Sequence, residues 1–238
     1  TLLAADALKL PSMRLIGYGA SPIHPETMRR VQRVLPGVDF VNLFGQTEGS
    51  PLTVLTPSDH RAAASGREEL LKSVGRPAPG VELQIHDPGP DGVGEVWARS
   101  AHSFVVDDDG WQHTGDLGRL VDGYLYLVGR KGDKIIRGGE NVFPAEIEET
   151  LHQHKDVADA AVVGVEDEKF GQALVAHVVL RDGASASADD LRKHVKAHLA
   201  NDKVPREIVF HDELPRNETG KVLKRKLVDE KEPEKEQQ

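Results

Sequence analysis

A strand–helix–strand pattern near the start of the chain constrains the fold more than any other feature of the sequence. Residues 13–18 are apolar enough for a buried strand, and they lead through small residues 19–21 into a helix that begins at Pro25. That helix ends at the Pro-Gly pair 36–37, and residues 38–44 predict a second strand. This order is typical of a parallel sheet in an α/β fold, where ligands bind beyond the carboxyl ends of the strands.

The rest of the chain has two other patterns. Between residues 74 and 130, short alternating strands and Gly- or Asp-rich turns predict a small antiparallel barrel or sheet. After residue 144 the pattern predicts a compact α+β lobe of two helices and three strands. We therefore expect a lobe at residues 1–131, a second at 132–228, and a charged, disordered tail at 229–238.

Composition narrows the class of protein. Hydrophobic residues make up 38% of the chain and charged residues 29%, which fits a soluble globular protein without a membrane span. The net charge of -9 argues against nucleic acid as a partner. The absence of cysteine excludes disulfides and thiolate nucleophiles and suits a cytoplasmic location. Because the chain starts with Thr1, we expect its natural N-terminus to lie upstream.

Four polar turns that contain glycine carry the candidate chemistry. They are residues 19–21 (GAS), 44–48 (FGQTE), 113–116 (HTGD) and 215–221 (PRNETGK). Thr47 can hydrogen-bond a phosphate, and Glu48 can hold a metal ion. Asp116 can accept hydrogen bonds from ribose hydroxyls, and Lys221 can meet a phosphate charge. Taken singly, each pattern is more often a plain turn than a site, so the interpretation depends on all four together.

Together and in this order, the four turns resemble the adenylate-forming superfamily, which includes acyl-CoA synthetases, luciferases and the adenylation domains of peptide synthetases. The resemblance is most specific in residues 113–146 and 215–221. It implies the end of a large α/β lobe with a small β-barrel, followed by a complete, mobile α+β lobe. The family's phosphate loop lies upstream of the region where this sequence starts, so most of the large lobe is expected to be missing.

The resemblance implies a nucleotide site on the large lobe. Its nucleotide-binding residues would be Gly19, Ala20, Ser21, Phe44, Gly45, Gln46, Thr47, Asp116 and Arg130. Gly19 and Ala20 would line the adenine pocket, and Phe44, where many relatives have Tyr, would lie against the base. Asp116 and Arg130 would hold the ribose of ATP or AMP.

Three residues would carry the first half-reaction of the family, in which a carboxylate attacks the α-phosphate of ATP. Lys221 would bridge the carboxylate and the α-phosphate, where negative charge accumulates. Thr47 would contact the α-phosphate, and Glu48 would bind Mg²⁺. The alternative for Lys221 is a solvated turn lysine, but the Thr-Gly pair at residues 219–220 matches the family loop.

The second half-reaction, thioester formation, would depend on the small lobe. Gly138, Gly139 and Glu140 would line the path of the pantetheine arm of coenzyme A, because residues 137–144 resemble the acyl-CoA synthetase sequence. Gly132 stands where relatives commonly have Asp or Lys as the hinge, and glycine would loosen that hinge.

The sequence therefore predicts an acid–CoA ligase that uses ATP, Mg²⁺, coenzyme A and a carboxylic acid. Without the phosphate loop, the chain alone is expected to show negligible ATP–pyrophosphate exchange, and the N-terminal lobe could be supplied by another chain. Two alternatives stay open. One is an adenylation domain that loads a carrier protein, and the other is a non-catalytic remnant or split half that binds nucleotide, coenzyme A or a partner.

Overall fold

The computed structural model describes residues 12–20, 23–218 and 220–229. Ser21, Thr219 and the predicted tail beyond residue 229 lie outside the described residues. The chain divides into two compact units, of which the first ends at Leu127 and the second begins at Val128.

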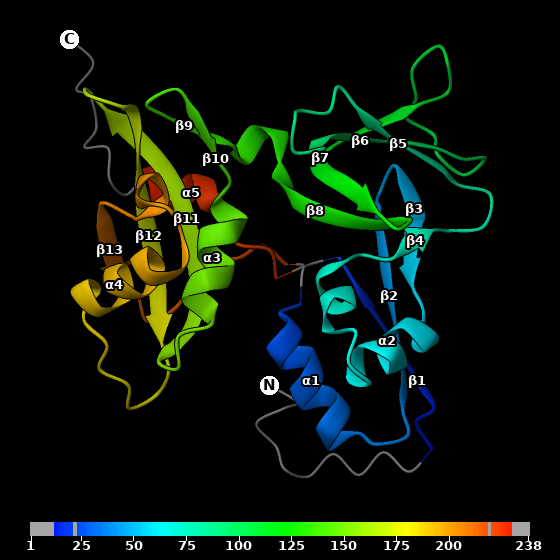
Figure 1. Cartoon of the computed structure of the whole chain (residues 1–238), viewed down its shortest axis with the longest axis horizontal. Coiled ribbons are helices and arrows are strands. Elements are labelled where there is room, and N and C mark those ends of the chain that lie inside the picture. The colour runs from blue at the N-terminus through cyan, green and yellow to red at the C-terminus, as the bar shows by residue number, and fades with distance from the viewer. Residues whose placement is uncertain (1–11, 21–22, 219, 230–238) are drawn as a thin grey trace. The chain divides into compact units, whose positions relative to one another are not determined.

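The first unit starts with a sheet of four strands in the order β1-β2-β3-β4 (Figure 1). Strands β1 (Leu15–Gly19) and β2 (Asp39–Gln46) are parallel and are joined by helix α1 (Pro25–Val34). The predicted strand–helix–strand unit is thereby confirmed. Strand β3 (Gly49–Leu55) turns back antiparallel to β2, and the short β4 (Arg76–Pro77) pairs with β3.

Helices pack against this sheet through one apolar cluster. Besides α1, helix α2 (Pro57–Ala64) and the 3-10 helix η2 (Glu68–Lys72) contribute to it. The buried members of the cluster are Met28, Phe40, Leu55, Ala63, Leu70, Leu71 and Tyr124. Thr56 and Asp59 form a reciprocal capping box that fixes the start of α2. This core holds β1 and β2 in place, and their carboxyl ends carry several of the candidate residues.

The second sheet of the first unit has the order β5-β6-β7-β8. Strands β5 (Glu82–His86), β6 (Gly94–Arg99) and β7 (Gln112–Val121) are antiparallel neighbours. Strand β8 (Tyr124–Arg130) follows β7 after a two-residue turn at 122–123 and crosses the boundary between the units. The antiparallel sheet of short strands is therefore confirmed, and among the described residues its pairings do not close into a barrel. The prediction of a turn at residues 113–116 was wrong, because these residues lie inside β7.

The second unit is built on a five-stranded sheet. Strands β11 (Val157–Asp167) and β12 (Gly171–Leu180) form a long antiparallel pair, and β13 (Glu207–Phe210) lies parallel to β12. A small hairpin of β9 (Ile135–Arg137) and β10 (Glu140–Val142) joins the sheet through β9 and β12.

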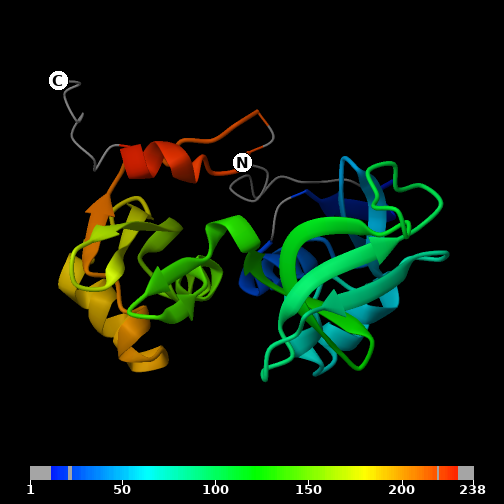
Figure 2. The same cartoon turned by 90° about the horizontal axis from the view of Figure 1, so that it is seen from above.

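Helices cover both faces of this sheet (Figure 2). Helices α3 (Pro144–His152) and α4 (Ala188–His198) pack on one face, and the short α5 (Lys224–Asp229) lies on the other. Successive side chains of β11 lie on opposite faces of the sheet. Val162 belongs to the core under α3 and α4, whereas Val163 belongs to the core under α5. Within the described residues, no helix is both long and apolar enough to cross a membrane.

Candidate functional site

The carboxyl end of β1 lies too close to β2 for a side chain. Gly19 pairs with Leu43, and a Cβ atom on Gly19 would lie 2.3 Å from the Leu43 carbonyl oxygen. Ala20 follows with a φ of 65°, a conformation that is sparsely allowed for a residue other than glycine. Such backbone strain tends to persist at binding sites. At the position predicted to meet the base, Gly19 and Ala20 thus expose mainly backbone atoms. Ser21 lies outside the described residues.

The carboxyl end of β2 contains an irregularity in the strand pairing. The pairing of β2 with β3 shifts between Phe44 and Gln46, which leaves Gly45 at the irregular position. A Cβ atom on Gly45 would lie 2.7 Å from Oγ of Ser50, so a larger residue would displace β3. Phe44 is half-buried. The glycine of this motif is therefore required by the close approach of β3.

The candidate phosphate and metal residues share one hairpin turn. Thr47 and Glu48 join β2 to β3 and lie between the paired residues Gln46 and Gly49. Thr47 is exposed and Glu48 is half-buried. A backbone hydrogen bond of 3.0 Å from Phe104 N to Glu48 O ties the loop after β6 to this turn. The turn thus places a hydroxyl and a carboxylate next to each other.

Glu48 fits a magnesium ion that is bound mainly through substrate. Within the described residues, no three His, Asp or Glu side chains are grouped so that they could hold a metal ion by themselves. Mg²⁺ usually takes one or two carboxylates and completes its shell with water and substrate phosphates. A single half-buried carboxylate beside a predicted phosphate position matches that mode of binding.

Asp116 accepts a hydrogen bond from Gln46, which a second glutamine bonds in turn. Its residue is only 6% exposed, and Gln46 Nε2 donates to Asp116 Oδ2 at 2.8 Å and to the Thr114 carbonyl oxygen at 2.6 Å. Gln112 Nε2 donates in turn to Gln46 Oε1 at 3.2 Å. Because Gln46 directly precedes the Thr47–Glu48 turn, the predicted ribose carboxylate and the predicted phosphate turn belong to one hydrogen-bonded assembly.

Strand β7 explains how these side chains meet. Gln112, Thr114 and Asp116 are buried and alternate with the more exposed His113 and Gly115. Thr114 Oγ1 donates to the Val96 carbonyl oxygen at 2.6 Å and accepts from the Asp116 amide at 3.1 Å. Sequence reasoning did not single out Gln112. Its spacing of four residues from Asp116 within one strand was the signal that places both on the same face.

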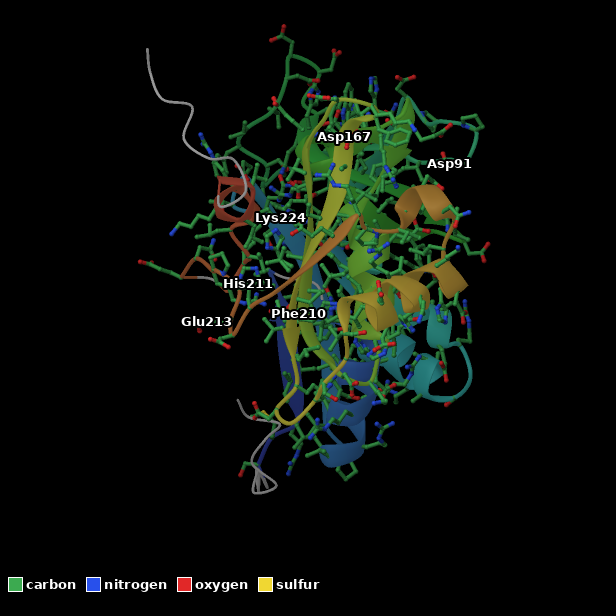
Figure 3. All side chains as sticks on the ribbon, turned by 90° about the vertical axis from the view of Figure 1, so that its left-hand side faces the viewer. Asp91, Asp167, Phe210, His211, Glu213 and Lys224 are labelled. Atoms are coloured by element: carbon green, nitrogen blue, oxygen red, sulfur yellow. The ribbon has the colours of Figure 1, made fainter. Side chains whose placement is uncertain are left out.

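Lys221 belongs to the second unit and lies in the turn before α5. Its backbone amide donates to Asn217 Oδ1 at 2.8 Å, and the Asn217 amide donates to the Lys221 carbonyl oxygen at 2.9 Å. The residue is exposed, and within the described residues its ammonium group has no hydrogen-bond or ion-pair partner. Lys224, labelled in Figure 3, instead pairs with Glu148 at 2.7 Å. The two neighbouring lysines thus differ, and Lys221 is the one available to a ligand.

Gly138 and Gly139 form the two-residue turn of the β9–β10 hairpin. Their φ angles are 60° and 89°, and they lie between the paired residues Arg137 and Glu140. Hairpin turns with two positive φ angles favour glycine, so local geometry alone accounts for both residues. A Cβ atom on Gly138 would lie 3.4 Å from Phe170 Cδ1, whereas one on Gly139 would have no neighbour within 4 Å. The turn therefore exposes its backbone, and the space beside Gly139 is open. Glu140 is exposed next to the turn.

The remaining two predicted residues lie near the start of the second unit. Arg130 ends β8 and is exposed, and Gly132 lies in the 3-10 helix η3 (Lys131–Asp133). A Cβ atom on Gly132 would meet nothing within 4 Å, and its φ is not positive. Neither crowding nor backbone conformation requires a glycine at this position.

Two protein-family models match the chain, one in each unit. The model described as AMP-binding enzyme matches residues 1–105, and the model described as AMP-binding enzyme C-terminal domain matches residues 146–221.

Individual proteins align along nearly the whole chain. The indoleacetate–CoA ligase of Aromatoleum aromaticum is 38% identical, over 90% of this chain and 44% of the ligase. The fatty acid–[acyl-carrier-protein] ligase ScoC of Streptomyces coeruleorubidus is 37% identical, over 92% of this chain and 44% of its own length. The solved structure of the amide bond synthetase McbA from Marinactinospora thermotolerans has a TM-score of 0.85 at 35% identity, covering 94% of this chain and 48% of that one. The chain thus spans less than half the length of these relatives.

Proposed function

The chain belongs to the AMP-binding, adenylate-forming family, and from this premise we propose that the protein containing it is an ATP-dependent acid–thiol ligase of the acyl-CoA synthetase type. Its substrates would be a carboxylic acid, ATP and coenzyme A. The chain by itself would be inactive, because the phosphate loop and most of the acid pocket would lie in the rest of the large lobe, on the same chain or another. A cytoplasmic location is part of the proposal, since a chain without cysteine suits a reducing compartment.

The observation that carries this proposal is the oriented carboxylate of Asp116 next to the Thr47–Glu48 turn. A buried carboxylate lowers stability unless it is hydrogen-bonded, and Gln46 provides such a bond at 2.8 Å. A carboxylate is also an acceptor that suits the two neighbouring hydroxyls of a ribose. The adjoining turn offers the hydroxyl and carboxylate that a phosphate and its cation need, so the assembly is complementary to a nucleotide.

In the first half-reaction, a carboxylate oxygen of the acid attacks the α-phosphorus of ATP. The bond between that phosphorus and the bridging oxygen breaks, pyrophosphate leaves, and an acyl-adenylate remains. Thr47 would donate to an α-phosphate oxygen, and Lys221 would place its ammonium between the acid and the phosphate as negative charge concentrates there. A Mg²⁺ ion held at Glu48 would supply positive charge to the phosphates. Arg130 would donate to the nucleotide beside Asp116.

In the second half-reaction, a thiol sulfur attacks the acyl carbon, loses its proton to solvent, and AMP leaves. The Gly138–Gly139 turn, which has no side chains, would leave a narrow path for a pantetheine arm, with Glu140 at its edge. Gly132 would serve as the hinge between the two half-reactions. Coenzyme A is the favoured acceptor because residues 137–144 resemble acyl-CoA synthetases. A carrier-protein thiol is the second candidate, since a relative named as a carrier-protein ligase is 37% identical.

The test is acid-dependent ATP–pyrophosphate exchange by the full-length protein with a panel of aliphatic and aromatic carboxylic acids. We expect exchange with at least one acid and no measurable exchange by residues 1–238 alone. Thioester formation is then compared between coenzyme A and a phosphopantetheinylated carrier protein, with faster reaction expected for coenzyme A. Nucleotide binding without exchange for any acid would favour the non-catalytic alternative over the ligase.

A further inference from the structure

We propose that Gln112 is a positioning residue for the nucleotide site, which orients Gln46 so that Gln46 in turn holds Asp116. The inference rests on the proposed function, in which Asp116 receives the ribose hydroxyls. Gln112 needs no contact with the nucleotide for this role, because it acts through the side chain of Gln46. It therefore differs from the residues that touch the substrate.

Hydrogen bonding allows only one orientation of both amides. The Thr114 carbonyl and the Asp116 carboxylate are acceptors, so Gln46 must turn its Nε2 toward them, at 2.6 and 2.8 Å. Its Oε1 then faces Gln112, whose Nε2 donates at 3.2 Å. Rotating the Gln46 amide by half a turn would set its oxygen against two acceptors, and rotating the Gln112 amide would bring two oxygens together. Gln112 is thus the donor that satisfies Gln46 Oε1 in this orientation and thereby stabilises it.

Packing alone does not explain a polar side chain at position 112. The residue is 1% exposed, and its Oε1 is buried without a hydrogen-bond partner in the part of the chain that the structure describes. A buried acceptor without a partner lowers stability, which an apolar side chain of the same length would avoid. The donor end of the amide makes the hydrogen bond of this side chain, and that bond connects Gln112 through Gln46 to Asp116.

Gln112 also supports the phosphate turn directly. A Cβ atom on Gly49 would lie 2.6 Å from Gln112 Oε1, so Gly49 packs its backbone against this amide. Gly49 and its pairing partner Gln46 flank the Thr47–Glu48 turn. Gln112 therefore contacts the backbone that flanks the Thr47–Glu48 turn and, through Gln46, orients the Asp116 carboxylate on its own strand. Loss of the amide should affect ribose recognition most, because only that part depends on the orientation of Gln46.

The test compares ATP with 2′,3′-dideoxy-ATP as ligands of the full-length protein by isothermal titration calorimetry. The ratio of their dissociation constants measures how strongly the ribose hydroxyls are recognised. Gln112→Met keeps the length of the side chain and removes its donor, so ATP affinity should fall about tenfold while dideoxy-ATP affinity changes little. Gln84→Met removes an exposed glutamine from β5 in the same sheet and should leave both affinities unchanged.

Asp116→Ala separates failure of this inference from failure of the proposed function. If Asp116→Ala abolishes the ribose preference and Gln112→Met leaves it intact, the inference is overturned and the proposed function stands. An equal loss of affinity for both nucleotides in Gln112→Met also overturns it, because that is the effect of a merely structural residue. If Asp116→Ala keeps the preference, the ribose role fails and the inference falls with it.

A second variant covers the case in which Gln112→Met does not fold. Gln46→Met changes a half-buried residue and breaks the same chain of hydrogen bonds from its other end. The same selective loss of ribose preference is expected for Gln46→Met. An unchanged ratio of the two dissociation constants in a folded Gln46→Met protein would overturn the inference.

Discussion

The candidate residues of the two units are held in opposite ways. In the first unit, Gln46 bonds Asp116 at 2.8 Å, and a Cβ atom on Gly19 would lie 2.3 Å from a backbone oxygen. In the second unit, the Lys221 ammonium has no partner among the described residues, and a Cβ atom on Gly139 would meet nothing within 4 Å. The first unit thus resembles a preformed binding surface, whereas the second presents its candidate groups on open turns. Substitutions should therefore couple stability to function at Gly19 in the first unit and separate them at Lys221 in the second.

The largest effect is expected for Lys221→Ala. Removing a preorganised positive charge from a developing negative one should slow acid-dependent ATP–pyrophosphate exchange on the order of 100-fold or more. The melting temperature should not change, because Lys221 is exposed and its ammonium makes no hydrogen bond or ion pair among the described residues. Lys226→Ala, a change at an exposed lysine of α5, is the matched control and should keep full activity. A clear drop in the melting temperature of Lys221→Ala would break the contrast between the two units.

Gly19→Ala should show the opposite coupling in the first unit. The added methyl group would overlap the Leu43 carbonyl oxygen, so the free energy of unfolding should fall by roughly 1–3 kcal/mol and nucleotide binding should weaken with it. Gly17→Ala is the matched control in the same strand, since its Cβ would meet only Val41 Cγ1, at 3.8 Å. Urea denaturation of both variants measures the difference. Equal stability of Gly19→Ala and Gly17→Ala would show that β1 and β2 are not rigidly held.

The sequence predicted the elements whose side chains repeat regularly. The strand–helix–strand unit around Pro25 was evident because apolar residues recur at the helix and strand periods on either side of clear breaks. Strand β3 was not predicted, because Pro51 interrupts its short apolar pattern and the preceding turn was interpreted only for its chemistry.

The candidate site was predicted residue by residue but not as a connected assembly. Thr47, Glu48 and Asp116 followed from motif resemblance, whereas the bond from Gln46 to Asp116 joins residues 70 positions apart. Local patterns do not encode which side chains of two separate sheets meet. Gln112 was missed because residues 113–116 were interpreted as a turn, so the strand that places Gln112 and Asp116 on one face was not predicted.

Substitution of two glycines of the second unit by alanine should affect stability differently. Gly139→Ala forces an L-residue to a φ of 89° and should lower the free energy of unfolding by about 1 kcal/mol. Gly132→Ala meets no neighbour within 4 Å and needs no positive φ, so it should leave stability unchanged or raise it by up to ~1 kcal/mol through the unfolded state. Urea denaturation of the two variants compares them directly. Destabilisation by Gly132→Ala would mean that residues 131–133 adopt another backbone conformation in solution.

The smallest effect concerns buried His60 of the first unit. Burial lowers the pKa of His60 below its ordinary value, while His60 Nε2 lies 2.8 Å from the Tyr18 hydroxyl and Nδ1 lies 2.8 Å from the Thr56 carbonyl oxygen. The unfolded chain therefore binds a proton more readily than the folded one. The contribution of neutral His60 is present above the unfolded pKa, about 6.5, and is lost as pH falls toward the lower folded pKa.

Urea midpoints at about pH 7.5 and pH 5.5 measure this contribution. The fall in stability between the two pH values should be smaller in His60→Gln than in the unsubstituted protein. His102→Gln, a change at an exposed histidine, should keep the full pH dependence. Burial also lowers the pKa of His194 in the second unit, but that residue is only half-buried, so His194→Gln should change the slope less than His60→Gln. The reverse order would contradict the tighter burial of His60 relative to His194.

The most direct test of the central claim measures both half-reactions in the full-length protein and in two variants of the second unit. Pyrophosphate exchange reports adenylation, and thioester formation from supplied acyl-adenylate reports acyl transfer. Lys221→Ala should slow adenylation on the order of 100-fold or more and leave acyl transfer nearly unchanged. Gly139→Val should slow acyl transfer and spare adenylation. Equal losses in both half-reactions for either variant would contradict the assignment of separate roles to these two turns.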